Sequence, residues 1–288
     1  MTDERPPRPP RRFSLTLYLL IVFALSWPAQ IIGAACAANL RELYIANAVS
    51  MVLVGVATFI CARFVFRDGL SGAGWRWGRA RWYLLALGVP ILLWAVPTLR
   101  DIKVGSLELP DALTREQLGW IFILLFVTII PAFGEEIGWR GYMLPRMAAH
   151  RSPRKAVFLH GVIWWAWHLP VLVGMGVHVG YSVSAEGTGP SSIILYAILI
   201  PVAAAVPATL HGIFIAWLWH RSRSIAIATV YHTAYDGIRD SIQTTIGEGS
   251  STSLIATAVL SLLGLLCLIF GKWEGLSADH TAPAPAVE

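Results

Sequence analysis

Residues 121–145 read IFILLFVTIIPAFGEEIGWRGYMLP. The first half of this stretch is almost entirely apolar and, with its flanks, is long enough to cross a bilayer as a helix. The second half places two adjacent glutamates, Glu135 and Glu136, and then Arg140 in the same run. Ionisable side chains are costly inside a bilayer, and where they occur they usually serve a function. The interpretation of the whole chain therefore depends on whether these three groups lie in the membrane.

The composition indicates that most of the chain lies in a lipid bilayer. Of the 288 residues, 56% are hydrophobic and only 14% are charged. Several apolar runs are long enough to span a bilayer, so we predict an all-α, polytopic membrane protein. The net charge of +5 comes from short basic clusters between the runs, a pattern typical of topology signals, and we expect no nucleic acid partner. The three cysteines include no CxxC pair and are expected to be small apolar residues.

The apolar runs predict about eight transmembrane helices. Seven spans are an alternative, because the run at 224–243 is less apolar than its neighbours. Pro201 and Pro207 predict a kink or a break in the sixth helix. The first run could be a cleaved signal, but its length and the runs that follow it favour an anchor. The predicted spans are 13–35, 45–66, 82–99, 118–144, 156–175, 192–219, 224–243 and 253–270.

Loop charge predicts the orientation. Arginine-rich segments precede the first run and follow the second, fourth and sixth, whereas the other loops are balanced or acidic. The positive-inside rule then places the arginine-rich loops and both termini in the cytoplasm, with a bacterial plasma membrane as the expected location. We predict a transmembrane domain over 13–271. The proline-containing tails at 1–12 and 272–288 are expected to be disordered.

Helix geometry gives the depth of the glutamates. If the helix of the fourth run continues to Arg146 at the cytoplasmic edge, Glu135 lies about 15 Å inside the membrane. Glu136 and Arg140 stand one helical turn apart and are predicted to pair, which would leave Glu135 free for another role. In the alternative interpretation both glutamates end the span at the interface, and Arg140 is an anchor.

Two later runs carry ionisable residues to a similar depth. The fifth places Trp164 and His168 one turn apart, and the seventh does the same with His232 and Asp236. A lone histidine in a span most often hydrogen-bonds to a neighbouring helix. Ionisable groups from three spans instead predict one shared site, because burying each of them separately would be costly. The four groups are Glu135, His168, His232 and Asp236. Two further histidines are interpreted as packing behind this site: His160 and His211.

Three motifs follow one another along the chain: EEIGWR at 135–140, WWAWH at 164–168 and HTAYD at 232–236. Their order resembles the pattern of the CAAX prenyl protease type II group, also called the CPBP or Abi intramembrane protease family. The resemblance covers about residues 118–240. In the family the second motif usually begins with phenylalanine, where this chain has Trp164. The third usually ends in asparagine, where this chain has Asp236.

The resemblance implies an intramembrane endopeptidase that hydrolyses a peptide bond of a membrane-associated protein or peptide in the lipid bilayer. It also implies an active-site cavity open to the cytoplasmic side. Glu135 and His168 would activate water, while His232 and Asp236 would stabilise the oxyanion. An ionised aspartate cannot donate a hydrogen bond, so Asp236 must be protonated, orient His232 or bind a metal. The implied catalytic residues are Glu135, Glu136, Arg140, His168, His232 and Asp236.

The sequence is also compatible with a bound metal ion and with two functions other than peptide hydrolysis. A divalent metal such as zinc could be held by Glu135, His168, His232 and Asp236, although the chain has no HExxH motif. A non-catalytic family member could serve in bacteriocin immunity or membrane-protein assembly. An ion- or proton-coupled transporter is the third possibility, because intramembrane Glu, His and Asp also form ion sites. No repeat between the two halves of the chain supports the transporter.

Overall fold

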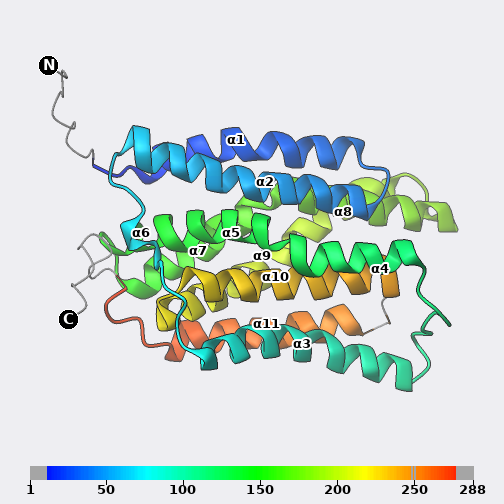
Figure 1. Ribbon diagram of the computed structural model, residues 1–288. Helices are drawn as coiled ribbons and strands as arrows, with labels where there is room; N and C mark the ends of the chain where they lie inside the picture. Colours follow the sequence, from blue (N-terminus) through cyan, green and yellow to red (C-terminus); the bar gives the residue numbers. More distant parts are fainter. Residues whose placement is uncertain (1–11, 248, 250, 277–288) are drawn as a thin grey trace, which may run out of the picture.

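The computed structural model describes residues 12–247, 249 and 251–276. Within these residues the chain forms helices and no strand, which confirms the all-α prediction. The helices lie side by side, and the chain runs back and forth between the two ends of the bundle (Figure 1). Apart from Arg12 and residues 272–276, the predicted disordered tails lie outside the described residues.

Six helical stretches are long and apolar enough to cross a bilayer. A seventh would be formed by α7 (Pro153–Trp167) and α8 (Leu169–Val183), which are bent by 50° relative to each other. The protein is therefore an integral membrane protein with multiple spans. The six stretches are α1 (Leu15–Cys36), α2 with its π-helical end (Leu40–Val65), α3 (Ala80–Lys103), α4 to α6 (Arg115–Ala148), α9 (Ser191–Ser222) and α11 (Thr252–Phe270).

Each of the eight predicted ranges contains a helix, but six or seven of them, rather than eight, have the length and hydropathy of a span. The helix that falls short is α10 (Ile225–Ser241), in the range 224–243. It has 17 residues, of which 13 are buried. Neighbouring helices therefore cover α10, and it does not need an apolar surface toward lipid.

Proline acts differently in the fifth and sixth predicted spans. The fifth bends where α7 ends at Trp167 and extends to Val183, beyond the predicted limit of 175. Pro170 cannot donate a backbone hydrogen bond to the preceding turn, which accounts for the break there. By contrast, α9 continues through Pro201 and Pro207 as one helix of 32 residues, so these prolines do not break it.

The fourth span changes its helical type along its length. Its N-terminal part, α4 (Arg115–Phe122), begins at Thr114 with a capping box to Gln117. A π-helical segment over Ile123–Val127 leads to α5 (Ile129–Glu136), and a second over Ile137–Met143 leads to α6 (Leu144–Ala148). The two glutamates thus end α5, and the arginine lies in the π-helical segment, a geometry that is frequent at functional sites.

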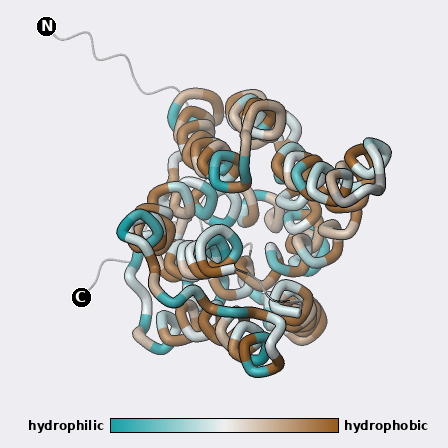
Figure 2. The backbone as a smooth tube through the Cα atoms, turned by 90° about the vertical axis from the view of Figure 1, so that its right-hand side faces the viewer, coloured by the Kyte–Doolittle hydropathy of each residue, from teal (hydrophilic) through white to brown (hydrophobic). Residues whose placement is uncertain are grey.

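Apolar residues face outward. Large side chains on the outer helices are well exposed, such as Leu20 at 63%, Ile194 at 68% and Leu254 at 72%. The end-on view in Figure 2 shows hydrophobic residues throughout the ring of helices. The polar helix α10 packs against α3, α5 and α9. The bundle therefore presents an apolar surface to lipid and keeps its ionisable residues inside.

Two glycines beside the ionisable residues let the helices approach closely. A Cβ at Gly134, just before Glu135, would lie 2.6 Å from the carbonyl oxygen of Met51 on α2. A Cβ at Gly237, just after Asp236, would lie 2.6 Å from the carbonyl oxygen of Leu124. Small residues permit such contacts between membrane helices. They bring α2, the fourth span and α10 together at the depth of the site.

Candidate functional site

Glu135 is the penultimate residue of α5 and is fully buried. Its Oε2 accepts a hydrogen bond of 2.7 Å from the indole Nε1 of Trp164 on α7. Its Oε1 has no hydrogen-bond partner in the described structure. The nearest basic atom to Oε1 is Nε2 of His168, at 3.9 Å. Glu135 thus presents one free carboxylate oxygen toward a histidine, at a distance too long for a direct hydrogen bond.

Glu136 is engaged by two basic side chains. Its Oε1 accepts hydrogen bonds of 2.8 Å from Arg140 and 2.7 Å from Nδ1 of His232 on α10. The predicted i,i+4 pair is confirmed, and both members are fully buried. The Arg140 guanidinium also lies 4.9 Å from the ring centre of Trp164. This cluster ties the fourth span to α7 and α10, and it leaves Glu135 as the glutamate without a directly hydrogen-bonded cation.

His232 and Asp236 form the second half of the ionic cluster. Nε2 of His232 lies 3.2 Å from Oδ2 of Asp236, one turn along α10. Oδ1 of Asp236 lies 3.0 Å from the guanidinium of Arg239. Both ring nitrogens of His232 therefore face carboxylates. Because an ionised carboxylate can only accept, a ring that donates to both is an imidazolium. This geometry corresponds to an Asp236 that orients His232.

His168 lies at the break between α7 and α8. Its Nδ1 lies 2.7 Å from the carbonyl oxygen of Trp164, which can only accept, so Nδ1 carries a proton. In a neutral ring Nε2 then carries the lone pair, and this nitrogen is the one that faces Glu135. The rings of Trp164 and Trp167 lie edge-to-face against His168, with centroids 4.5 and 4.7 Å away. The helix break and the two indoles hold the imidazole in position.

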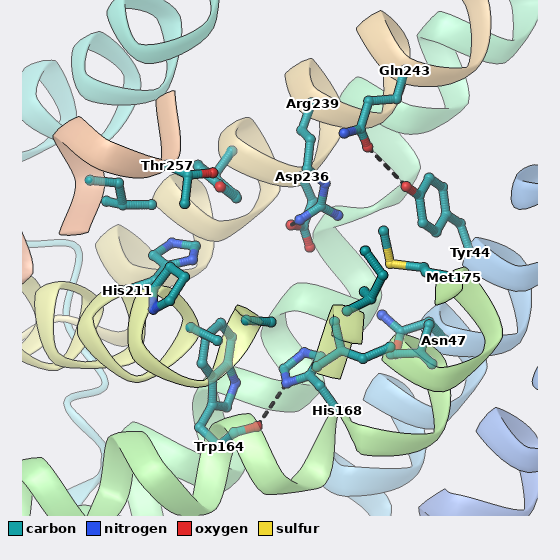
Figure 3. Close-up of a pocket in the computed structure, with 18 of the residues that line it drawn as sticks. Tyr44, Asn47, Trp164, His168, Met175, His211, Asp236, Arg239, Gln243 and Thr257 are labelled. Carbon is teal, nitrogen blue, oxygen red and sulfur yellow. Dashed lines mark hydrogen bonds and ion pairs between the residues drawn. The ribbon is translucent and has the colours of Figure 1, made fainter. Parts of the chain in front are cut away.

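A cavity of about 380 Å³ opens beside these residues. His168, His232 and Asp236 lie in its wall, and Figure 3 shows side chains from α2, α8, α9, α10 and α11 around it. Glu135 does not line the cavity and lies behind Trp164 and His168. The wall is apolar on the side of α8 and α9 and polar on the side of α2 and α10. A ligand with both apolar and polar parts fits such a lining.

The position of the cavity conflicts with one prediction. Tyr44 and Gln243 lie in its wall and are joined by a hydrogen bond of 2.9 Å. They lie near the start of α2 and just beyond the end of α10, at the end of the bundle away from the arginine-rich loops (Figures 1 and 3). If those loops are cytoplasmic, the cavity extends toward the opposite face. The predicted orientation and the predicted cytoplasmic opening are therefore incompatible, and a reversed orientation would restore the cytoplasmic opening.

The proposed metal ligands do not form a common binding site in this arrangement. His232 directs both ring nitrogens to carboxylates, and Asp236 contacts His232 and Arg239 with its two oxygens. Only Glu135 and His168 keep a free donor atom toward each other. Among the residues that the structure describes, no three His, Cys, Asp or Glu side chains form a group that could hold a metal ion. The four donors thus do not fit a divalent metal without rearrangement.

The structure brings all six predicted catalytic residues together, but the sequence analysis missed three features of the site. Arg239 was overlooked, although it lies three residues after Asp236 on the same helix. The hydrogen bond from Trp164 to Glu135 could not be inferred from spacing. His211 lies in the cavity wall, with its Nε2 3.1 Å from the Tyr231 hydroxyl, whereas His160 is fully buried and does not line the cavity.

The fold and site define a polytopic membrane protein with a buried cluster of glutamates and histidines on three helical stretches. Residues 117–238 match the family described as Rce1-like, the type II CAAX prenyl endopeptidases. The chain is also 27% identical over 153 residues to CAAX prenyl protease 2 of Methanococcus maripaludis. That match covers 52% of this chain, and the chain spans about half the length of the relative, 50%. Over residues 117–238 the chain is therefore similar to the Rce1-like type II CAAX prenyl endopeptidases.

Proposed function

We propose that the protein is an intramembrane endopeptidase that hydrolyses a peptide bond of a membrane-associated protein or peptide. The observation that carries this proposal is the pair of hydrogen-bond acceptors, Oε1 of Glu135 and Nε2 of His168, which face each other at 3.9 Å beside the cavity. Oε1 of Glu135 is not accessible to water in this structure, so the surrounding side chains must shift to admit a water about 2.8 Å from both atoms, which then donates one proton to each. Its lone pair would then point away from both, toward a substrate carbonyl in the cavity.

The reaction needs no group beyond these residues and water. Glu135 accepts the proton of the attacking water while His168 holds the second proton by a hydrogen bond. The positive charge of His232, fixed between Glu136 and Asp236, stabilises the oxyanion that develops on the carbonyl oxygen. Glu135 then returns its proton to the leaving amine, so the peptide bond breaks and the carboxyl and amino products form. In this proposal Asp236 acts on His232 and does not donate to the substrate.

The position of the wall residues suggests where the substrate approaches. The cavity lies between outer helices whose surfaces are apolar, so a substrate anchored in the bilayer can reach it without leaving the membrane. Its polar wall on α2 and α10 can contact the backbone of an extended peptide.

The test is turnover by the purified full-length chain in detergent, using a library of internally quenched peptides with and without an added lipid chain. We expect cleavage above the buffer rate, with new amino termini identified by mass spectrometry. Peptide capture without cleavage would favour the non-catalytic alternative. Ion or proton flux in liposomes without cleavage would favour the transporter, and either outcome would overturn the peptidase proposal.

A further inference from the structure

Arg239 occupies a position that the reaction above does not use. Its NH1 lies 3.0 Å from Oδ1 of Asp236, and its Nε donates a hydrogen bond of 2.7 Å to Oδ1 of Asp240. Its guanidinium carbon lies 5.5 Å from the ring centre of Tyr235 and 5.8 Å from that of Tyr44. The side chain is 27% exposed and lines the cavity. Two carboxylates and two aromatic rings thus hold the arginine in the cavity wall.

These contacts extend the ionic cluster in one direction. From the cavity inward, the guanidinium of Arg239 contacts Asp236, which contacts His232, which contacts Glu136. Positive and negative groups alternate along this series, and Glu136 ends it by pairing with Arg140. Each internal member depends on its neighbours, because an unpaired charge in a buried setting is strongly unfavourable.

We propose that Arg239 is a positioning residue for the peptidase reaction. It holds the carboxylate of Asp236 in the orientation that fixes the ring of His232 at the cavity wall. The inference rests on the proposed function, since His232 acts there on the developing oxyanion. Figure 3 shows Arg239 and Asp236 side by side at the wall, across the cavity from His168.

The charges predict an unusual result for combined substitutions. Asp236→Asn removes a negative charge, so Arg239 is paired with Asp240 alone and its charge beside His232 is no longer balanced by Asp236. Arg239→Gln removes the positive charge, so Asp236 keeps only its contact with His232 and Asp240 loses its arginine. The double substitution removes one charge of each sign, and the resulting neutral amides can still hydrogen-bond to each other and to the His232 ring. We therefore expect the double variant to be more active than either single variant.

The experiment compares kcat and KM of wild type, Asp236→Asn, Arg239→Gln and the double variant with one quenched peptide. We expect each single substitution to lower kcat about 100-fold with a much smaller change in KM, because the ring that stabilises the oxyanion is misplaced. The double variant should recover to within about tenfold of wild type. Arg239→Lys, which keeps the charge, should retain more activity than Arg239→Gln and replaces it if that variant does not fold.

The matched control is Arg41→Gln, which breaks the pair of Arg41 with Glu116 at 3.1 Å on the exposed surface, and its kcat should not change. Thermal unfolding of every variant separates loss of fold from loss of positioning. Two results would overturn the inference and leave the peptidase proposal intact. One is a loss of kcat in the double variant that equals the combined losses of the single variants. The other is that Arg239→Lys and Arg239→Gln change kcat and KM equally. A wild type that cleaves no peptide would overturn the proposed function. In that case the coupling is tested by stability: if the change in melting temperature of the double variant equals the sum of the changes in the two single variants, the Asp236–Arg239 coupling is also refuted.

Discussion

Two neighbouring carboxylates at the end of α5 have opposite surroundings. Glu136 accepts hydrogen bonds from Arg140 and His232, at 2.8 and 2.7 Å. Glu135 accepts one hydrogen bond from the neutral indole of Trp164 and directs its other oxygen toward His168 without a bond. The first arrangement neutralises a buried charge and joins the fourth span to α10. Oε2 of Glu136 also has no hydrogen-bond partner, so the difference between the two glutamates lies in the cations bound to Glu136 and in the histidine that the free oxygen of Glu135 faces.

The largest expected effect concerns the structural glutamate. Glu136→Gln or Arg140→Ala leaves a partner charge unpaired in the interior, and we expect a loss of about 3–5 kcal/mol in stability. Folded yield after membrane extraction and the thermal unfolding temperature measure this loss. Glu116→Gln, which removes a surface partner of Arg41, is the control and should behave like wild type. A Glu136→Gln variant as stable as wild type would contradict the division of roles between the two glutamates.

A smaller effect is expected at the indole that holds Glu135. Trp164→Phe removes a hydrogen bond of 2.7 Å to the carboxylate but keeps an aromatic ring beside Arg140 and His168. A hydrogen bond to a charged group contributes about 1.5 kcal/mol, so kcat should fall about tenfold. Steady-state kinetics of the folded variant test this. An unchanged kcat would show that Glu135 does not need the indole to stay in position.

We expect no effect from removal of divalent metals. The donor atoms of His232 and Asp236 are directed to other side chains, so the proposed reaction activates water with Glu135 and His168 and uses His232 only for its charge. Exhaustive chelation followed by metal analysis and a rate measurement tests this expectation. Inactivation by the chelator that is reversed by zinc would show that the site rearranges around a metal and would overturn the metal-free mechanism.

The last prediction concerns the orientation of the chain in the membrane, and its test changes no residue of the site. Reporters fused after Arg154 and after Arg223 should score cytoplasmic, and reporters near Glu108 should score external. Glu248, the predicted position of a further external reporter, lies outside the described residues. An external score after Arg154 would reverse the predicted orientation, and the Tyr44–Gln243 end of the cavity would then face the cytoplasm.

The comparison of the two glutamates also shows how far the sequence could lead. Spacing alone predicted the pairing of Glu136 with Arg140, because residues four apart on a helix are neighbours. The position of each residue along its helix predicted that His168, His232 and Glu135 lie at a similar depth and share one site. The partners that decide the roles come from other helices: Trp164 donates to Glu135, and His232 donates to Glu136. Such contacts depend on how the helices rotate and pack, which a periodic pattern does not specify.

The prediction of about eight spans, with seven as the alternative, exceeds the six or seven helices that are long and apolar enough, and the reason is related. A count of apolar runs assumes that every crossing helix faces lipid, whereas α10 is covered by its neighbours and can carry polar and ionisable residues among its apolar ones. The bend at His168 was missed although Pro170 was visible, and Pro201 and Pro207 were expected to disturb a helix that continues through them. Proline marks where a helix is able to bend, and packing decides whether it does.

The central claim is that Glu135, and not its neighbour, accepts the proton of the attacking water. The most direct test is the cleavage rate of one quenched peptide by folded Glu135→Gln, whose amide can still accept the Trp164 hydrogen bond but cannot take up a proton. The account predicts a wild-type unfolding temperature and a rate lower by about 10³-fold. A correctly folded Glu135→Gln protein that cleaves the peptide at the wild-type rate would contradict it.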